Sequence, residues 1–176
     1  MGETEYRSAV CRAMQVVAAH PRAIFMGQAV TRPGTAMSDT LRGVSRSKLL
    51  ELPVFEDTQM GMAIGMAIGG WFPITVYPRW NFLLCATNQL VNHLDKLARY
   101  SGGSYRPRVI VRVGIGASEP LDPGPQHLGD FTDAFRMLLK STRVVRLEEP
   151  SEIVGEYESA MKREGSTVLV EDVRRY

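Results

Sequence analysis

Hydrophobic and polar positions alternate along this chain in a way that predicts helices separated by short strands. Segment 6–19 carries apolar residues at helical spacing, and His20-Pro21 ends it because the residue before a proline disfavours helical geometry. Short apolar or β-branched runs between such segments indicate buried strands. We therefore expect helices at 6–19, 60–70, 81–100, 131–140 and 152–163, and strands at 23–27, 50–55, 72–77, 109–113, 144–147 and 167–170.

Two stretches, 28–46 and 114–126, show no hydrophobic period and are predicted to be long loops. Loops of this length in a compact domain often carry function. Strands that are separated by helices usually pair in parallel. At 176 residues the chain suits one domain. We therefore expect a single α/β domain, a three-layer sandwich with a mainly parallel sheet flanked by helices.

Composition and charge narrow the range of partners. The chain is 44% hydrophobic and 23% charged, as in soluble globular proteins. A net charge of +2 is too small to indicate nucleic acid or an acidic membrane surface as a partner. The N-terminus lacks the basic and apolar regions of a signal peptide, and no apolar run approaches the roughly 20 residues of a membrane span. These features favour a cytoplasmic protein.

Several familiar catalytic patterns are absent. Gly114-Ile115-Gly116 follows a predicted strand but lacks the third glycine and the helix of a dinucleotide fingerprint. No phosphate-loop motif occurs. The two cysteines form no C-x-x-C pair, and the three histidines show no ligand spacing, so the sequence indicates no metal site.

One acid occupies an unusual position. Glu56 stands between the predicted strand 50–55 and a glycine-rich helix, where a carboxylate is well placed to contact a ligand; a solvated acid at a strand end is the alternative. Gly61, Gly65 and Gly69 recur every four residues and share one helix face. Each glycine costs about 1 kcal/mol relative to alanine, which close packing must offset. That packing is either inside this chain or against another subunit.

Aromatic residues and a histidine are further candidates. Tyr77, Trp80 and Phe82 cluster just after a predicted strand, where they form core or line a pocket for a flat ring. His127 lies at the edge of the loop 114–126, and loops are where reacting groups concentrate.

An ordered series of motifs then carries a resemblance. Leu52-Pro53-Val54-Phe55-Glu56 is followed by glycine-rich, aromatic and amide-rich segments at near-constant spacing: 61–65, 70–74, 81–82, 88–93, 101–103, 116–117, 126–127 and 168–171. The series resembles the pyrimidine-binding domain of thiamine-diphosphate enzymes. The closest variety is the beta subunit of the decarboxylating component of 2-oxo acid dehydrogenases, and the middle domain of transketolase is a more distant one.

The resemblance implies roles for individual residues. Glu56 would hydrogen-bond the N1′ atom of the cofactor's aminopyrimidine, and Phe82 would stack on that ring. Phe55 and Pro78 would also contact the cofactor. His127 would help to move protons of the substrate.

Two further residues complete the expected site. Gln126, beside the histidine, would contact the substrate. Arg79 occupies a position near the cofactor, where it would contact an anionic substrate. Gly61, Gly65 and Gly69 would form a subunit interface.

The same resemblance implies cofactors and partners. The Gly-Asp-Gly…Asn signature that holds the metal and the diphosphate in this family is missing. Thiamine diphosphate and Mg²⁺ are therefore expected to bind with a diphosphate-binding alpha-type subunit, which holds most of the Mg²⁺ contacts, in an α2β2 assembly. Residues 1–176 would be a single pyrimidine-binding domain, without the diphosphate-binding and C-terminal transketolase domains.

The expected reaction is cleavage of a 2-oxo acid or a ketose, followed by transfer of the acyl or ketol fragment to an acceptor. The missing C-terminal domain favours a carboligase or decarboxylase over a beta-like subunit of a 2-oxo acid dehydrogenase. Two alternatives remain open: a non-catalytic scaffold or regulatory partner of such an enzyme, and a self-contained small-molecule binder of flavodoxin type.

Overall fold

A single parallel sheet forms the centre of the molecule. The computed structural model describes residues 4–32, 35–119 and 122–176. Six strands lie in the order β2-β1-β3-β4-β6-β5, and each neighbouring pair is parallel. The strands are β1 (Ala23–Gly27), β2 (Leu49–Glu51), β3 (Phe72–Tyr77), β4 (Ile110–Ile115), β5 (Arg143–Arg146) and β6 (Thr167–Asp172).

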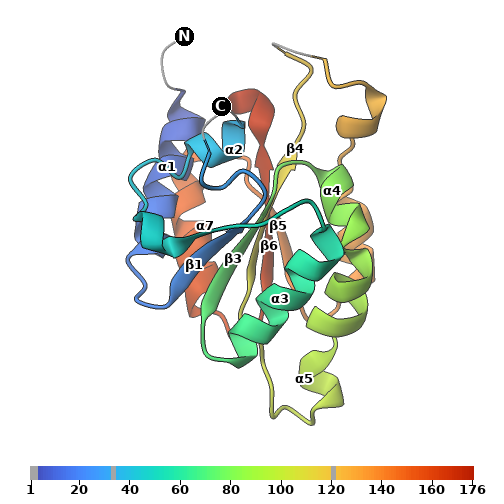
Figure 1. Cartoon of the computed structure of the whole chain (residues 1–176). Coiled ribbons are helices and arrows are strands. Elements are labelled where there is room, and N and C mark those ends of the chain that lie inside the picture. Colours follow the sequence, from blue (N-terminus) through green and yellow to red (C-terminus); the bar gives the residue numbers. More distant parts are fainter. Residues whose placement is uncertain (1–3, 33–34, 120–121) are drawn as a thin grey trace.

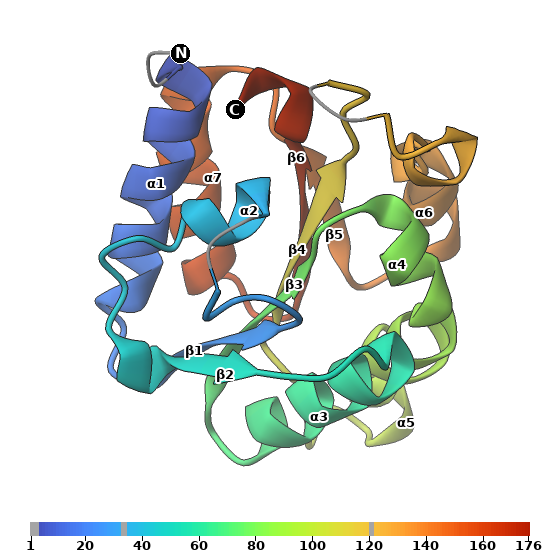
Figure 2. The same ribbon diagram turned by 45° about the horizontal axis from the view of Figure 1, so that its top comes forward.

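Helices cover both faces of this sheet, as Figures 1 and 2 show. One face carries α1 (Glu5–Ala18) and α7 (Pro150–Lys162); the other carries α3 (Glu56–Ile68), α4 (Trp80–Cys85) and α6 (Thr132–Leu138). Successive side chains of a strand enter opposite cores, so that Ile110 belongs to the core under α1 and α7 and Val111 to the other. The predicted α/β sandwich is confirmed.

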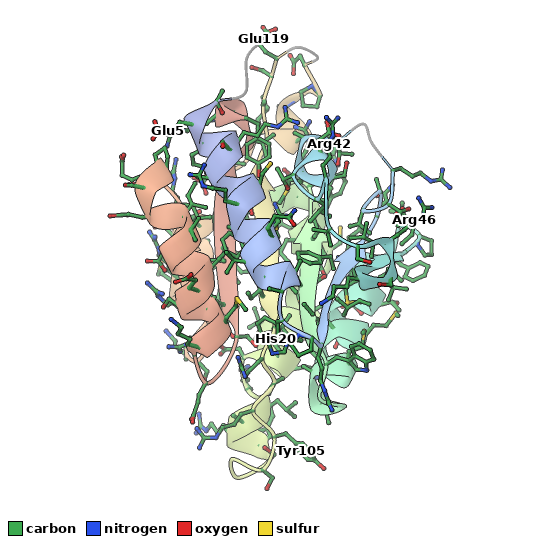
Figure 3. The ribbon with its side chains drawn as sticks, turned by 90° about the vertical axis from the view of Figure 1, so that its left-hand side faces the viewer. Glu5, His20, Arg42, Arg46, Tyr105 and Glu119 are labelled. Carbon is green, nitrogen blue, oxygen red and sulfur yellow. The ribbon has the colours of Figure 1, made fainter. Side chains whose placement is uncertain are left out.

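The ends of the strands define two ends of the molecule. Because the strands are parallel, their carboxyl ends meet on one side, where ligands of open α/β sheets usually bind. Figure 3 places Glu119, which follows β4, at this end, and Tyr105, which precedes β4, at the opposite end. No helix within the described part of the chain is long and apolar enough to cross a membrane.

An ion pair lies fully buried beside the centre of the sheet. Arg112 of β4 donates from Nε and Nη2 to the two carboxylate oxygens of Glu171 on β6, both at 2.7 Å. The hydroxyls of Tyr157 and Tyr176 also donate to Glu171, and Arg112 Nη2 donates to Thr40 Oγ1 at 3.0 Å. This network joins two strands, α7, the segment after β1 and the C-terminal residue.

The predicted strand 50–55 is wrong in its second half. Only Leu49–Glu51 form β2, and the backbone N–H of Leu52 makes one further bond, to Gly27 O at 3.0 Å. Pro53 has no N–H to extend the ladder. Glu56 consequently does not end a strand but begins α3.

The predicted single helix 81–100 is also wrong, because the structure divides it. After α4 comes a wider π-helical stretch, Gln89–Leu94, and then α5 (Leu97–Tyr100). The N–H of Asp95 donates to Leu90 O at 3.0 Å, five residues back. The buried Asp95 carboxylate then accepts from backbone N–H groups of the turn at 140–142, so a tertiary contact sets the helix geometry here.

The loop 28–46 contains a short helix that the hydrophobic pattern did not predict. Thr35 is the N-cap of α2 (Ala36–Asp39). Its hydroxyl oxygen accepts a hydrogen bond from the backbone N–H of Ser38, and Ser38 Oγ accepts one from the backbone N–H of Thr35. Such a capping box stabilises a helix without any hydrophobic period. The described part of the chain also contains single turns of 3₁₀ helix at Arg46–Lys48, Pro125–His127 and Val173–Arg175.

Candidate active site

Glu56 lines a small cavity at the carboxyl end of the sheet. The side chain is half-buried, and the cavity measures about 10 Å³. Its walls come from the residue after β1, the approach to α3 and the first turn of that helix, the end of β3, and one aromatic residue of α4. The lining residues are Gln28, Pro53, Val54, Phe55, Glu56, Gln59, Val76, Tyr77, Pro78 and Phe82.

Two buried side chains fasten the first turn of α3 to β3. Gln59 Nε2 donates to Thr75 Oγ1 at 2.7 Å and to Val76 O at 3.0 Å. The hydroxyl of Tyr77 donates to the backbone oxygen of Glu56 at 3.2 Å. Burial raises the pKa of Tyr77, a side-chain hydrogen bond with Thr75 opposes this shift, and the nearby acidic side chains at the N-terminus of α3 add to it. The backbone that carries Glu56 is therefore held in place.

A larger cavity of about 480 Å³ adjoins the small one and shares Gln28, Pro78 and Phe82 with it. Most of its lining is small or apolar, and Arg79 and Glu119 are its charged members. The other lining residues are Ala29, Thr35, Ala36, Met37, Gly116, Ala117, Pro123 and Val173. The two cavities together place an acid, an aromatic ring and room for a ligand at one end of the sheet.

Arg79 fastens the loop that follows β4. Its Nη1 donates to His127 O at 3.2 Å and lies 3.5 Å from Ala117 O. Gly116 lies in the same close contact: a Cβ on this residue would lie 2.1 Å from His127 O, so only glycine fits there. The imidazole of His127 packs against Phe82, with ring centroids 5.4 Å apart. Arg79 thus holds the backbone of His127, and Phe82, three residues later, packs against its imidazole ring.

Glu51 fixes the loop that follows β1. Its Oε1 accepts from Ala29 N at 2.5 Å, and its Oε2 accepts from Thr31 N and Thr31 Oγ1, both at 2.8 Å. These bonds hold Ala29 at φ 60°, a conformation that non-glycine residues seldom adopt. Burial acts to raise the pKa of Glu51, but the hydrogen bonds from Thr31 and Ala29 outweigh it and hold this pKa below its usual value.

The structure brings most of the predicted site residues together. The four predicted cofactor contacts, Glu56, Phe55, Pro78 and Phe82, all line the small cavity. Arg79 lines the large cavity, although one of its nitrogens is committed to backbone oxygens. His127 is half-buried next to Phe82, whereas Gln126 is exposed and lines neither cavity. Their roles remain predictions.

Sequence reasoning did not single out four residues that shape this region: Gln28, Glu51, Gln59 and Gly116. Gln28 could have been predicted from the sequence, because it directly follows a strand whose carboxyl end faces the site. Gly116 was considered as part of a dinucleotide motif and of the series that carries the resemblance, but not for its close contact with the loop. Glu51 and Gln59 act through hydrogen bonds to residues distant in sequence, which leave no local pattern.

Gly61 and Gly65 of α3, and Gly69, which caps the C-terminus of this helix, do not pack closely against the described residues. A Cβ on Gly65 would meet no described atom within 4 Å, and one on Gly61 would meet only the Gln89 amide, at 3.7 Å or more. A Cβ on Gly69 would face carbonyl oxygens of its own helix. Met62 and Ile68 on this helix are exposed at 37% and 45%. The described residues therefore give no close packing that would explain Gly61 and Gly65, and the subunit interface remains a prediction.

No metal centre is visible in the described ranges. Residues 4–32, 35–119 and 122–176 contain no group of three or more His, Cys, Asp or Glu side chains that is placed to hold a metal ion.

Comparisons with known proteins identify the family and the fold of the chain. A family model described as the pyrimidine-binding domain of transketolase matches residues 3–176. The pyruvate dehydrogenase E1 component subunit beta of Gracilaria tenuistipitata var. liui is 30% identical over 129 residues, which cover 73% of this chain and 39% of that protein. Its counterpart from Staurastrum punctulatum is 28% identical over 160 residues, covering 89% and 48%.

A solved structure shares the fold. The structure titled "Split gene transketolase, inactive beta4 tetramer" superimposes with a TM-score of 0.72 at 14% identity, covering 98% of this chain and 52% of that one. The chain spans less than half the length of the two curated relatives above. On the family match over 3–176, the chain belongs to the family of transketolase pyrimidine-binding domains.

Proposed function

We propose that this chain supplies the pyrimidine-binding half of the active site of a thiamine-diphosphate-dependent enzyme. The enzyme cleaves a 2-oxo acid or a ketose and passes the acyl or ketol fragment to an acceptor. One observation carries the proposal: the Glu56 carboxylate and the Phe82 ring line the same cavity, beside a space of about 480 Å³, in a chain of this family.

The residues present fit one side of an aminopyrimidine site. The cavity at Glu56, about 10 Å³, holds roughly one water molecule and no ring. Its rim, however, includes Val54 and Phe55, which are 60% and 43% exposed. Large exposed apolar side chains beside an acid suit a site whose second wall comes from another domain. A diphosphate-binding alpha-type subunit is the proposed source of that wall and of most Mg²⁺ contacts.

Within this chain each side chain has a defined task. Bound thiamine diphosphate supplies the electron sink that a polypeptide lacks. Glu56 holds a proton at a ring nitrogen, and Phe82 offers its face to the ring, which adds about 0.5–1.5 kcal/mol beyond burial. Gln59 and Tyr77 keep the Glu56 turn on β3. His127, positioned by Arg79, moves protons of the substrate.

The large cavity is the proposed place of the substrate. Arg79 lines it, and only Nη1 of its guanidinium donates to a described protein atom. The remaining N–H groups suit a carboxylate or another anionic group of the substrate. Gln126 lies outside the lining, so its proposed substrate contact requires a rearrangement of the loop.

The exposed face of α3 is the proposed subunit contact. Gly65 has open space around it, and Met62 and Ile68 add apolar surface. Curated relatives are named as beta subunits, which supports an alpha-type partner. An α2β2 assembly is the proposed form of the complex. The structural neighbour is titled a β4 tetramer, so a second copy of this chain is the competing occupant of this face.

The second candidate function is that of a non-catalytic scaffold. A beta-like subunit of a 2-oxo acid dehydrogenase is a variant of the catalytic function proposed above. A scaffold does not need an acid and an aromatic ring in one cavity, which favours the catalytic proposal.

Calorimetry tests the split site: the lone chain should bind thiamine diphosphate feebly, and the complex with the diphosphate-binding partner and Mg²⁺ tightly. If the lone chain binds as tightly as the complex, the split site is wrong.

A further inference from the structure

A third cavity lies on the other side of the segment that follows β1. It measures about 260 Å³ and shares no lining residue with the two cavities near Glu56. We call it the arginine hollow. Its lining residues are Val30, Thr31, Arg32, Ser38, Asp39, Leu41, Arg42, Gly43, Val44, Arg46 and Leu49.

The charges of the arginine hollow are unbalanced. Three guanidinium groups, those of Arg32, Arg42 and Arg46, line it against a single carboxylate, that of Asp39. Asp39 is already engaged, by Arg42 at 3.1 Å and by Arg7 at 3.9 Å. Arg32 and Arg46 form no ion pair or side-chain hydrogen bond with any residue that the structure describes. Among the described residues, Arg46 therefore has no carboxylate partner, and Arg32 has only the longer-range attraction of Glu51, whose pKa it helps to lower.

The backbone around the hollow is held independently of any ligand. The hydrogen bonds from Thr31 to Glu51 fix the chain immediately before Arg32, and they hold the Glu51 carboxylate in place beside that segment. On the other wall, Gln15 Nε2 donates to Arg42 O at 3.0 Å. The next residue, Gly43, has φ +87°, and a Cβ there would lie 3.1 Å from the same Gln15 nitrogen.

Figure 3 shows Arg42 and Arg46 on the same side of the molecule, the side that carries α2. We propose that the arginine hollow binds a small molecule bearing a phosphate or diphosphate group. Guanidinium forks match phosphate oxygens in pairs, and such charge-assisted bonds are the strong ones. A cavity of about 260 Å³ exceeds a phosphate group, and Leu41, Val44 and Leu49 offer an apolar wall to a small organic body.

The position of α2 couples this hollow to the larger cavity. Ser38 and Asp39 line the arginine hollow, whereas Ala36 and Met37 line the cavity of about 480 Å³. An anion held by the hollow would therefore steady one wall of the proposed active site. This coupling rests on the proposed function, whereas anion binding itself does not.

Titration calorimetry of the full-length lone chain with inorganic pyrophosphate tests the binding. The expected result is saturable binding that weakens with added salt and weakens about tenfold in Arg32→Ala and in Arg46→Ala. Both side chains are exposed, so both variants should fold. The matched control is Arg99→Ala, which removes the same charge from an exposed position on α5 outside the hollow.

Pyrophosphate binding that is absent, or that weakens equally in all three variants, would overturn the proposal. Hydrogen exchange tests the coupling, because bound pyrophosphate should slow amide exchange across 35–46. Unchanged exchange there, with binding established, refutes the coupling alone. Thiamine diphosphate also bears a diphosphate, so its calorimetry with the lone chain is repeated in Arg46→Ala. Tight binding that persists in this variant refutes the split site, whereas binding that is lost in it belongs to the arginine hollow, so the two failures are distinguishable.

Discussion

Replacing Gly65 of α3 by alanine should have opposite effects on folding and on assembly. Alanine in a helix interior is favoured over glycine by about 1 kcal/mol. A Cβ at this position would meet no described atom within 4 Å, and the glycine has no positive φ, so nothing in the chain opposes the gain. We expect urea denaturation of the dilute lone chain to show a stabilisation of about 1 kcal/mol.

In the assembly the same methyl group would lie where another backbone approaches. Overpacking of a close contact costs typically 1–3 kcal/mol, so sedimentation should show about tenfold weaker association with the partner, or more. Gly155 of α7 is the matched control, since it is also helical, exposed and free of neighbours within 4 Å. Gly155→Ala should stabilise the chain equally and leave assembly unchanged. A destabilised Gly65→Ala chain, or unchanged association, refutes the interface.

Three further substitutions test the framework of the site. Glu171→Gln leaves the Arg112 guanidinium buried without its counter-charge and should reduce the free energy of unfolding by about 3–5 kcal/mol in urea; a loss below about 1 kcal/mol would show that the pair is not needed. Gly116→Ala places a Cβ 2.1 Å from His127 O and should cost about 1–3 kcal/mol; neutral stability would refute the tight turn. Glu51→Gln should destabilise the chain by about 1–3 kcal/mol at neutral pH. Because the folded pKa of Glu51 is depressed, its stabilisation is present above the ordinary value of 4.5 and is lost as the pH falls through the folded pKa, so the gap between wild type and variant must close in acid.

The hydrophobic pattern predicted the fold well because both helical and strand periods report burial. Each strand contacts a neighbour in parallel, as expected from the helices between them. The pattern failed where backbone hydrogen bonding overrides it. Pro53 ends the second strand early, and the capping box at Thr35 forms a helix with no apolar stripe. The π-helical turn before Asp95 depends on a partner about 45 residues away in sequence.

The candidate site was predictable in part for a similar reason. Glu56, Phe82 and their neighbours belong to a local series of motifs, and the structure places them in one cavity. Residues that act at a distance, such as Glu51 holding the loop after β1, carry no local signal. Arg79 is an intermediate case: its position was recognised, but its hydrogen bond to His127 O became visible only in the fold.

The central claim is that Glu56 serves the cofactor from this chain's side of a shared site. Its most direct test is the turnover of Glu56→Gln in the complex reconstituted with the diphosphate-binding partner. The account predicts that turnover falls about 100-fold or more, as for removal of a general acid–base group, while the complex still assembles. Undiminished turnover would contradict the account and leave this chain a scaffold.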